Sequence, residues 1–247
     1  MFNFFANEVD FSDNRFFIRG NDFNHIKNAL RMKTGDTFLV SCDGTSHLCS
    51  LLGFEDDAAV CEIIEEDYNN TELPIRIYLF QGLPKSDKLE LIIQKAVELG
   101  AHSIIPTEME HCVVRLDDKK KASRRSRWQT IAESAAKQSK RNIVPEIKEC
   151  MSYKQALDFA KTLDLLLVPY ESADGMAATK KALKKIKGGM SVGIIIGAEG
   201  GFSQAEIQAA KNVGGEIISL GKRILRTETA AISAVSLCML YAETELD

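Results

Sequence analysis

Residues 192–203 read Val-Gly-Ile-Ile-Ile-Gly-Ala-Glu-Gly-Gly-Phe-Ser, and residues 219–231 read Ser-Leu-Gly-Lys-Arg-Ile-Leu-Arg-Thr-Glu-Thr-Ala-Ala. The first stretch begins with a short apolar run, and the second comes at the end of one; such runs are typical of buried strands. In each stretch a glycine-containing loop follows the apolar run and a helix follows the loop. Ser203 and Glu206 form a capping-box pattern, which predicts a helix start, and the second helix is expected from about Thr227. Two glycine loops at the same end of neighbouring strands predict a pocket; the alternative is a pair of plain turns.

The first loop, residues 197–201, does not match the glycine motifs that bind phosphate. It lacks the lysine of the Walker pattern and the Gly-x-Gly-x-x-Gly spacing of the dinucleotide fingerprint. Glu199 would also lie where a pyrophosphate binds, and two negative groups within about 4 Å repel by roughly 1–4 kcal/mol. The loop therefore favours a neutral or cationic ligand, and it argues against a nucleotide-dependent oxidoreductase.

Length and composition limit the class of protein. The chain has 247 residues, 45% hydrophobic and 27% charged, as expected for a soluble protein of one large or two small domains. It has no run of 18 apolar residues and no signal-peptide pattern, so we expect a cytoplasmic protein without a membrane span. Its six cysteines form no Cys-x-x-Cys pair and its four histidines are scattered, so we expect neither a metal site nor disulfides.

Charge is distributed unevenly along the chain. The net charge is −4, but residues 1–71 hold 13 acidic and 5 basic side chains, a net charge of −8 that leaves +4 for the remainder. Residues 115–141 hold 10 basic and 3 acidic side chains. Such a cluster is either a solvated helix face or a surface that contacts nucleic-acid phosphates.

The first 70 residues predict short strands separated by turns, with one helix over 21–32. Asp43-Gly44 is a hairpin signal, and the polar stretch 67–74 suggests a linker. Closely spaced short strands are typical of a small barrel or sandwich. The predicted strands cover 3–7, 15–18, 37–41, 47–54 and 58–65.

From Ile75 onward, predicted strands alternate with helices, which is typical of a parallel α/β sheet. In such sheets ligands bind beyond the carboxyl ends of the strands, where residues 168–170, Gly197 and Gly221 lie. The predicted strands cover 75–80, 103–107, 146–149, 164–169, 192–196 and 216–220, and the helices 86–99, 122–140, 152–160, 174–187 and 227–243. The last helix is apolar almost all round, so either its own domain or a second subunit should bury it.

The two glycine stretches together resemble the ribosomal RNA small subunit methyltransferase E family. Further motifs carry the resemblance through nearly the whole chain, at residues 25–36, 94–100, Pro106, 128–132, 138–141 and Pro145. The resemblance implies an α/β fold with a C-terminal SPOUT-type parallel sheet, a trefoil knot and a small N-terminal PUA-like β-barrel. Physical rules alone predict no knot. The implied division is an RNA-binding barrel over 1–71 and a methyltransferase domain over 72–247.

The resemblance also implies the reaction, which is S-adenosylmethionine-dependent methylation of N3 of a uridine in 16S rRNA. The target lies in the decoding region of the small ribosomal subunit, near the 3′ end of the RNA, and the enzyme is a homodimer built partly on the last helix. The alternatives are a methyltransferase acting on another RNA site and a non-catalytic ribosome-binding or assembly protein. The cofactor residues implied are Leu167, Pro169, Tyr170, Gly197, Glu199, Gly200, Gly201, Leu220, Gly221, Ile224, Leu225, Arg226 and Thr227.

Methyl transfer to a uracil nitrogen requires an oriented base and stabilisation of negative charge on the ring oxygens. Arg226 is the first candidate for that stabilisation; a phosphate contact or a salt bridge is the alternative. Glu199 and Glu228 are candidate proton acceptors, although Glu228 also suits the dipole at a helix start.

RNA contacts are expected from basic and polar side chains in both halves of the chain. Members of the family usually carry an arginine before two aromatic residues near the N-terminus, whereas here Asn3 precedes Phe4 and Phe5. The helix end at 138–141 is either an RNA contact or simply polar. The predicted RNA-binding residues are His25, Arg31, Lys33, Arg115, Arg124, Arg125, Arg127, Gln138, Ser139, Arg141 and Arg223.

Overall fold

The computed structural model describes residues 1–171 and 175–246. The chain forms two compact units, which are described separately. Unit 1 comprises Met1–Glu72 and Ala136–Val144, and unit 2 comprises Leu73–Ala135 and the chain from Pro145 onward. The sequence predicted one boundary between residues 71 and 72 and did not predict that residues 136–144 return to unit 1.

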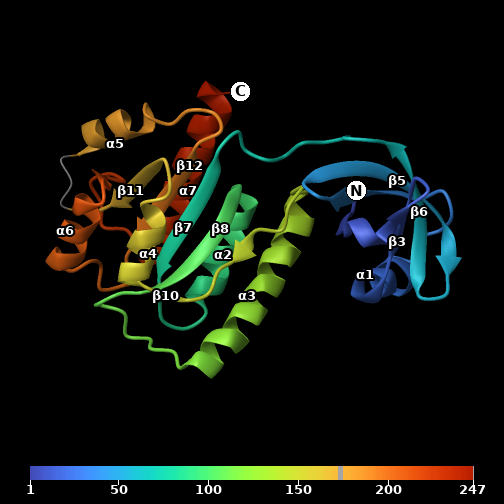
Figure 1. The fold of residues 1–247 in the computed structure, drawn as a ribbon, viewed down its shortest axis with the longest axis horizontal. Helices are drawn as coiled ribbons and strands as arrows, with labels where there is room; N and C mark the ends of the chain where they lie inside the picture. Colours follow the sequence, from blue (N-terminus) through green and yellow to red (C-terminus); the bar gives the residue numbers. More distant parts are fainter. Residues whose placement is uncertain (172–174, 247) are drawn as a thin grey trace. The chain divides into compact units, whose positions relative to one another are not determined.

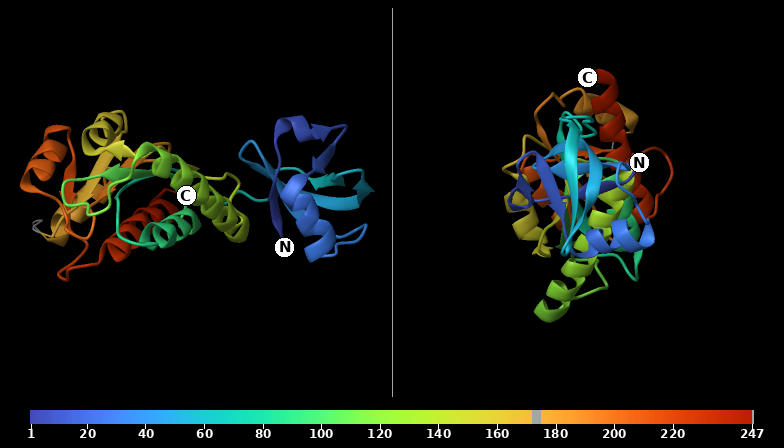
Figure 2. Two further views of the ribbon diagram at one scale, coloured as in Figure 1. Left: turned by 90° about the horizontal axis from the view of Figure 1, so that it is seen from below. Right: turned by 90° about the vertical axis from the view of Figure 1, so that its right-hand side faces the viewer.

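Unit 1 contains a curled, six-stranded mixed sheet in the order β1-β4-β5-β6-β3-β2 (Figure 2). β1 runs parallel to β4, and the other neighbours are antiparallel. Within the described residues β1 and β2 form two free ends, so the pairing does not close the sheet into a barrel. The strands are β1 (Asn3–Phe5), β2 (Phe11–Ser12), β3 (Arg15–Ile18), β4 (Thr37–Cys42), β5 (Thr45–Glu55) and β6 (Ala58–Glu65).

Aromatic and aliphatic side chains from the strands and from one short helix fill the core of unit 1, including Phe4, Phe16, Phe38 and Ile26. Asp43 and Gly44 both have positive φ in the turn between β4 and β5, which confirms the predicted hairpin. The helix predicted over 21–32 is shorter. A 3₁₀ turn covers Glu8–Asp10 (η1), α1 covers Gly20–Asn24, and a π-helical turn covers His25–Ala29 (η2). Helical geometry is lost by Arg31, whose φ is +53°.

Unit 2 is built on a parallel sheet in the order β10-β8-β7-β12-β11-β13, with β9 also paired to β8 (Figure 1). Every pairing in it is parallel, which confirms the predicted α/β class. All six residues of β12 are buried, as expected for an apolar strand covered on both faces. The strands are β7 (Arg76–Gly82), β8 (Ala101–Glu108), β9 (Glu146–Ile147), β10 (Met151–Ser152), β11 (Leu165–Pro169), β12 (Ser191–Ile196) and β13 (Glu216–Ile218).

Helices cover both faces of this sheet. α2 (Lys88–Glu98) and α7 (Thr227–Glu245) pack against each other on one face, and α4 (Tyr153–Ala160) lies on the other (Figure 2). The capping box predicted at Ser203 is formed, and Ser152 forms another with Gln155 at the start of α4. The remaining helices are α3 (Asp118–Ser139), α5 (Met176–Leu183) and α6 (Gln204–Asn212); Asp174, predicted to start α5, lies outside the described residues.

None of the helices in the described part of the chain has the length and apolar character that crossing a membrane requires. Among the same residues, no group of three or more His, Cys, Asp or Glu side chains is arranged to hold a metal ion.

Candidate functional site

A cleft of about 650 Å³ lies in unit 2 at the carboxyl ends of β11, β12 and β13. Its size is in the range of small-molecule sites, and its position is where parallel sheets bind ligands. The two glycine loops follow β12 and β13. These two strands were expected to be neighbours, but β11 lies between them. The cleft is therefore formed by three loops, Pro169–Glu171, Ile196–Phe202 and Ser219–Thr227, with Lys88 and Ala230 from helices.

Every cofactor residue predicted from the sequence lines this cleft except Leu167. Leu167 is buried within β11, where its side chain belongs to the core. Arg223, predicted to bind RNA, also lines the cleft. Lys88 could not be predicted from the sequence, because it lies 111 residues before Glu199, which it contacts. The other lining residues missed are Glu171, Ile196, Ala198, Phe202, Ser219 and Ala230.

Glycine is required at particular places in the two loops. Gly221 has a φ of +111°, which a residue with a side chain rarely adopts. A Cβ on Gly200 would lie 2.7 Å from the Cβ of His111, whose Nδ1 lies 2.8 Å from the carbonyl oxygen of Gly200. A Cβ on Gly197 would lie 3.0 Å from the carbonyl carbon of Gly201. Gly197 and Gly200 let the loop after β12 fold tightly beside the cleft, and Gly221 allows the turn after β13.

Buried hydrogen bonds connect the second glycine loop to the first. The Thr227 hydroxyl donates to the carbonyl oxygen of Gly197 at 2.6 Å and accepts from Gln81 Nε2 at 2.9 Å. Thr227 and Gln81 are 5% and 0% exposed, so losing either bond would leave a buried polar group unpaired. Thr227 therefore fixes the distance between the two loops. The sequence predicted Thr227 as a cofactor contact and did not predict this structural role.

The loop after β11, Pro169–Glu171, is anchored by both of the other loops. The Tyr170 ring contacts the Phe202 ring edge to face, and Gln204 Nε2 donates to the Tyr170 hydroxyl at 3.1 Å. On the other side, the backbone N–H of Tyr170 donates to the carbonyl oxygen of Ile218 in β13 at 2.9 Å. The three loops form one connected structure around the cleft.

Glu199 lines the cleft and is held by two donors, one side-chain ammonium group and one backbone N–H. Its Oε1 accepts hydrogen bonds from Lys88 Nζ at 2.8 Å and from the backbone N–H of Lys85 at 3.0 Å. Burial alone would raise the pKa of Glu199, but these two donors outweigh it and leave the pKa below its usual value. A carboxylate with a lowered pKa is a weak base, so the geometry disfavours Glu199 as the proton acceptor.

Glu228, in the first turn of α7, is the second predicted acceptor. Its Oε2 is buried, has no hydrogen-bond partner in the described chain, and lies 3.9 Å from Lys88 Nζ. Arg226 directly precedes α7 and is exposed on the cleft wall. Within the described residues its guanidinium makes neither a hydrogen bond nor an ion pair, so it is available to a ligand.

The predicted RNA-binding residues of unit 1 differ in accessibility. His25, Arg31, Lys33 and Gln138 are exposed, and Ser139 is half-buried. Arg141 does not fit the predicted role, because its side chain is only 3% exposed and forms an ion pair with Glu72 at 2.5 Å. Asn3, at the usual arginine position, is also buried and donates from Nδ2 to the carbonyl oxygen of Arg141.

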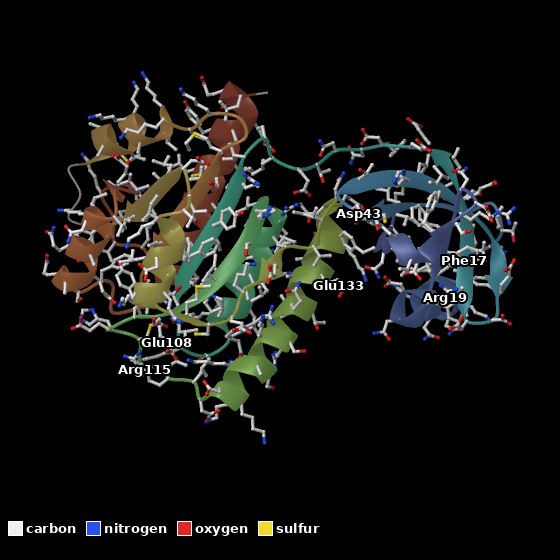
Figure 3. All side chains as sticks on the ribbon, viewed as in Figure 1. Phe17, Arg19, Asp43, Glu108, Arg115 and Glu133 are labelled. Carbon is white, nitrogen blue, oxygen red and sulfur yellow. The ribbon has the colours of Figure 1, made fainter. Side chains whose placement is uncertain are left out.

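The predicted RNA-binding residues of unit 2 fall into two groups. Arg115 and Arg124 are exposed, and Figure 3 shows Arg115 at the same end of the unit as Glu108, the last residue of β8. Arg125 and Arg127 are partly engaged within the protein. Arg125 Nε donates to the carbonyl oxygen of Ile147 at 2.8 Å, and Arg127 forms an ion pair with Glu90 at 2.8 Å.

Comparison with known proteins identifies the class and then the family. Residues 71–239, which include the whole cleft, match the family model of the RNA methyltransferase domain. The parallel sheet and its three-loop cleft are thus those of an RNA methyltransferase domain.

Individual relatives narrow this class. The chain is 42% identical over 235 residues to the ribosomal RNA small subunit methyltransferase E of Bacillus subtilis, covering 94% of this chain and 91% of the relative. It is 35% identical over 241 residues to that of Mesomycoplasma hyopneumoniae, covering 97% and 99%. The crystal structure of the Neisseria gonorrhoeae protein bound to S-adenosyl methionine shares 33% identity and a TM-score of 0.80, covering 96% of each chain. The chain belongs to the ribosomal RNA small subunit methyltransferase E family.

Proposed function

We propose that this protein uses S-adenosylmethionine to methylate N3 of a specific uridine in 16S rRNA, in the decoding region of the small ribosomal subunit. The observation that carries the proposal is the three-loop cleft of unit 2, in a chain whose relatives act on ribosomal RNA. We place the reaction in the cytoplasm, where the small subunit is assembled.

The residues of the cleft fit this cofactor. Tight glycine turns let backbone groups approach an adenosine closely, and Leu220, Ile224 and Leu225 supply apolar surface. Glu199 and the unpaired Oε2 of Glu228 suit a cation and oppose a phosphate. When bound, the cofactor supplies an electrophilic methyl group.

Arg226 is the residue that we assign to the acceptor base. Its unpaired guanidinium at the cleft can donate to the uracil oxygens on which charge develops when N3 loses its proton. Glu228 remains the candidate proton acceptor, because Glu199 is already held by Lys88 and the Lys85 N–H. The protein's contribution is therefore orientation and charge stabilisation.

For the RNA surface we propose those exposed members of the predicted set that form no ion pair among the described residues; Arg127 is exposed but paired with Glu90. In unit 2 these are Arg115, Arg124 and Arg223, and in unit 1 they are His25, Arg31, Lys33 and Gln138, with unit 1 acting as a PUA-like RNA-binding module.

The further assembly of the chain follows from its last helix. α7 packs on α2, yet Leu240 of α7 and Leu91 of α2 remain 53% and 43% exposed, which supports a homodimer formed partly by this helix. We also propose the trefoil knot of the SPOUT class. Its support is the crossing of the chain from β11 to β12, back over β11 to β13, and onward to α7 against β7 and β12.

Two measurements test the function. Calorimetric titration should show saturable S-adenosylmethionine binding by the purified protein. Incubation with methyl-labelled cofactor and small subunits lacking the modification should then label 16S rRNA, and mass spectrometry of the digested RNA should place the methyl group on uridine N3.

Each failure has a distinct meaning. Absence of saturable binding at millimolar cofactor would reject the methyltransferase proposal. Labelling of another nucleotide would show a methyltransferase with a different RNA site. Cofactor binding without transfer to either subunits or free rRNA, together with tight binding to the subunit, would indicate a non-catalytic ribosome-binding protein.

A further inference from the structure

Three charged side chains form what we call the charge cluster: Lys88 and Glu199, which line the cleft, and Glu228, which lies next to Lys88. Lys88 Nζ lies 2.8 Å from Glu199 Oε1 and 3.9 Å from Glu228 Oε2. The three residues come from α2, the loop after β12 and the first turn of α7, so only the fold brings them together. With both carboxylates ionised, one ammonium group faces two acids and the cluster has a net charge of −1.

The two carboxylates are not equally neutralised. Glu199 accepts hydrogen bonds from both Lys88 and the backbone N–H of Lys85. Glu228 Oε2 is buried without any donor among the described residues, and Lys88 at 3.9 Å is beyond hydrogen-bond distance. A buried carboxylate oxygen in this condition is stabilised by any further cation that binds nearby.

We propose that the charge cluster makes the cleft discriminate between the cationic cofactor and its neutral product, with Glu228 favouring the cation and Lys88 opposing it. This inference rests on the proposed function. Methyl transfer to the acceptor nitrogen breaks a C–S bond whose electron pair stays on sulfur, so a sulfonium becomes a neutral thioether. The proton of the nitrogen passes by way of the proton acceptor, for which Glu228 is the candidate, to solvent, and Glu228 is then ionised again for the next cofactor. The attraction to Glu228 is lost at that step, which favours exchange of the product for fresh cofactor.

Other charges around the cleft are less able to supply this discrimination. Glu171, Arg223 and Arg226 also line the cleft, but all three are exposed, and water and salt screen exposed charges strongly. The side chains of Lys88 and Glu228 are 31% and 16% exposed. Lys88 and Glu199 on the cleft wall, with Glu228 next to Lys88, therefore form the place where a unit of ligand charge has the largest effect.

The experiment compares S-adenosylmethionine with S-adenosylhomocysteine, which lacks the transferred methyl group and its positive charge. Calorimetry gives both dissociation constants for the wild type, Glu228→Gln, Lys88→Met and the control Lys85→Met. Lys85→Met removes the same charge nearby and keeps the backbone N–H that Glu199 accepts, and the Lys85 side chain does not line the cleft.

Opposite changes in the two variants are the expected result. Glu228→Gln should lower the preference for the cationic ligand about five- to tenfold, and Lys88→Met should raise it by a similar factor, as for unit charges roughly 6–8 Å apart in a partly solvated site. Lys85→Met should change it less than about twofold, because its charge is exposed. The charge-conserving variants Lys88→Arg and Glu228→Asp should keep the wild-type ratio.

The ratio separates an electrostatic role from a structural one. A distorted cleft would weaken both ligands together and leave their ratio unchanged, and that outcome, or a shift of the ratio in the same direction in both variants, overturns the inference. A wild-type protein that binds neither ligand overturns the proposed function instead. Circular dichroism of each variant establishes that it is folded. If Glu228→Gln or Lys88→Met does not fold, the affinity ratios of Glu228→Asp and Lys88→Arg are compared with that of the wild type instead.

Discussion

Arg226 and Glu199 lie on the same cleft wall, but their surroundings give them different chemistry. Glu199 is occupied by Lys88 and by the Lys85 N–H, whereas the Arg226 guanidinium is exposed and unpaired within the described chain. A donor that stabilises charge developing on a substrate needs at least one N–H that no internal acceptor occupies. This difference is why we propose Arg226 for the acceptor base and the acids for the cationic cofactor.

We therefore expect Arg226→Ala to separate binding from catalysis. Cofactor affinity should stay near normal, because the glycine turns and the apolar wall are untouched, while methyl transfer should fall by about 10²- to 10³-fold. Single-turnover labelling of small subunits at saturating cofactor measures the effect. Lys222→Ala, in the same exposed loop but outside the cleft lining, is the control. Equal rates in wild type and Arg226→Ala would remove Arg226 from the reaction.

At the scale of elements, the sheet of unit 2 is held in register by a polar bracket at the starts of β11 and β12. The backbone N–H and the hydroxyl of Ser191 both donate to Asp164 Oδ2, at 2.8 and 2.6 Å. These bonds hold the pKa of Asp164 below its ordinary value of 3.8. The bracket sets β11 beside β12 at the end of the sheet opposite the cleft.

The Asp164 bracket predicts how stability changes in acid. Because the folded-state pKa is lowered, its contribution is complete above pH 3.8 and is lost as the pH falls through the folded-state pKa. Asp164→Asn should be less stable than the wild type at neutral pH, with the difference shrinking toward acid. Denaturant unfolding between pH 2 and pH 7 measures this, with Asp56→Asn in the exposed β5–β6 turn as control. A difference that is constant with pH would contradict the bracket.

The basic segment that leads into α3 and covers its first turns makes a second element-scale prediction. Replacing Arg115, Lys119 and Arg124 together by glutamine should weaken RNA binding and reduce the salt slope of log K by about 0.7–0.9 for each RNA phosphate that the protein no longer neutralises. Fluorescence titrations with 16S rRNA fragments at several salt concentrations measure the slope. The matched control replaces three exposed lysines of the same unit, Lys180 and Lys181 in α5 and Lys184 directly after it. An unchanged slope would show that the basic segment is simply solvated.

Much of this architecture follows from local sequence signals. The alternation of strands and helices after Ile75, both capping boxes and the Asp43-Gly44 hairpin depend on near neighbours, and each is present. Strand order is different, because it depends on contacts between distant segments. Nothing local places β11 between β12 and β13. The helix predicted to reach residue 32 ends earlier, where Arg31 has a φ of +53° and the Met32 N–H donates back to the carbonyl oxygen of Ile26.

The candidate site shows the same division. The loop residues could be predicted because glycine, proline and the apolar run carry their own backbone geometry. Lys88 and Gln81 could not, because their roles arise only when α2 and β7 are placed beside loops more than 100 residues later. Arg141 was predicted to bind RNA because it lies in a basic stretch. The sequence gives no sign that its side chain will be buried in an ion pair with Glu72.

At the scale of the whole molecule, the last helix links the fold to its assembly. One side of α7 is buried against its own unit through Ala231, Ala234, Val235, Cys238 and Ala242. These are small side chains, and the larger ones, including Leu240, are left toward the surface. α7 packs against α2, and each of the two helices keeps an exposed leucine, Leu240 at 53% and Leu91 at 43%, which a second subunit would cover.

We accordingly expect the wild-type protein to have twice the 27.4 kDa chain mass in multi-angle light scattering, and Leu240→Glu to shift it to a single chain. Burying a leucine contributes about 1.5–3 kcal/mol, and a carboxylate in its place would lose that term and oppose association in both subunits at once. Val113→Glu, at a side chain 69% exposed elsewhere on unit 2, should leave the mass unchanged. A monomeric wild type would contradict the dimer, and a dimeric Leu240→Glu would place the interface on another surface.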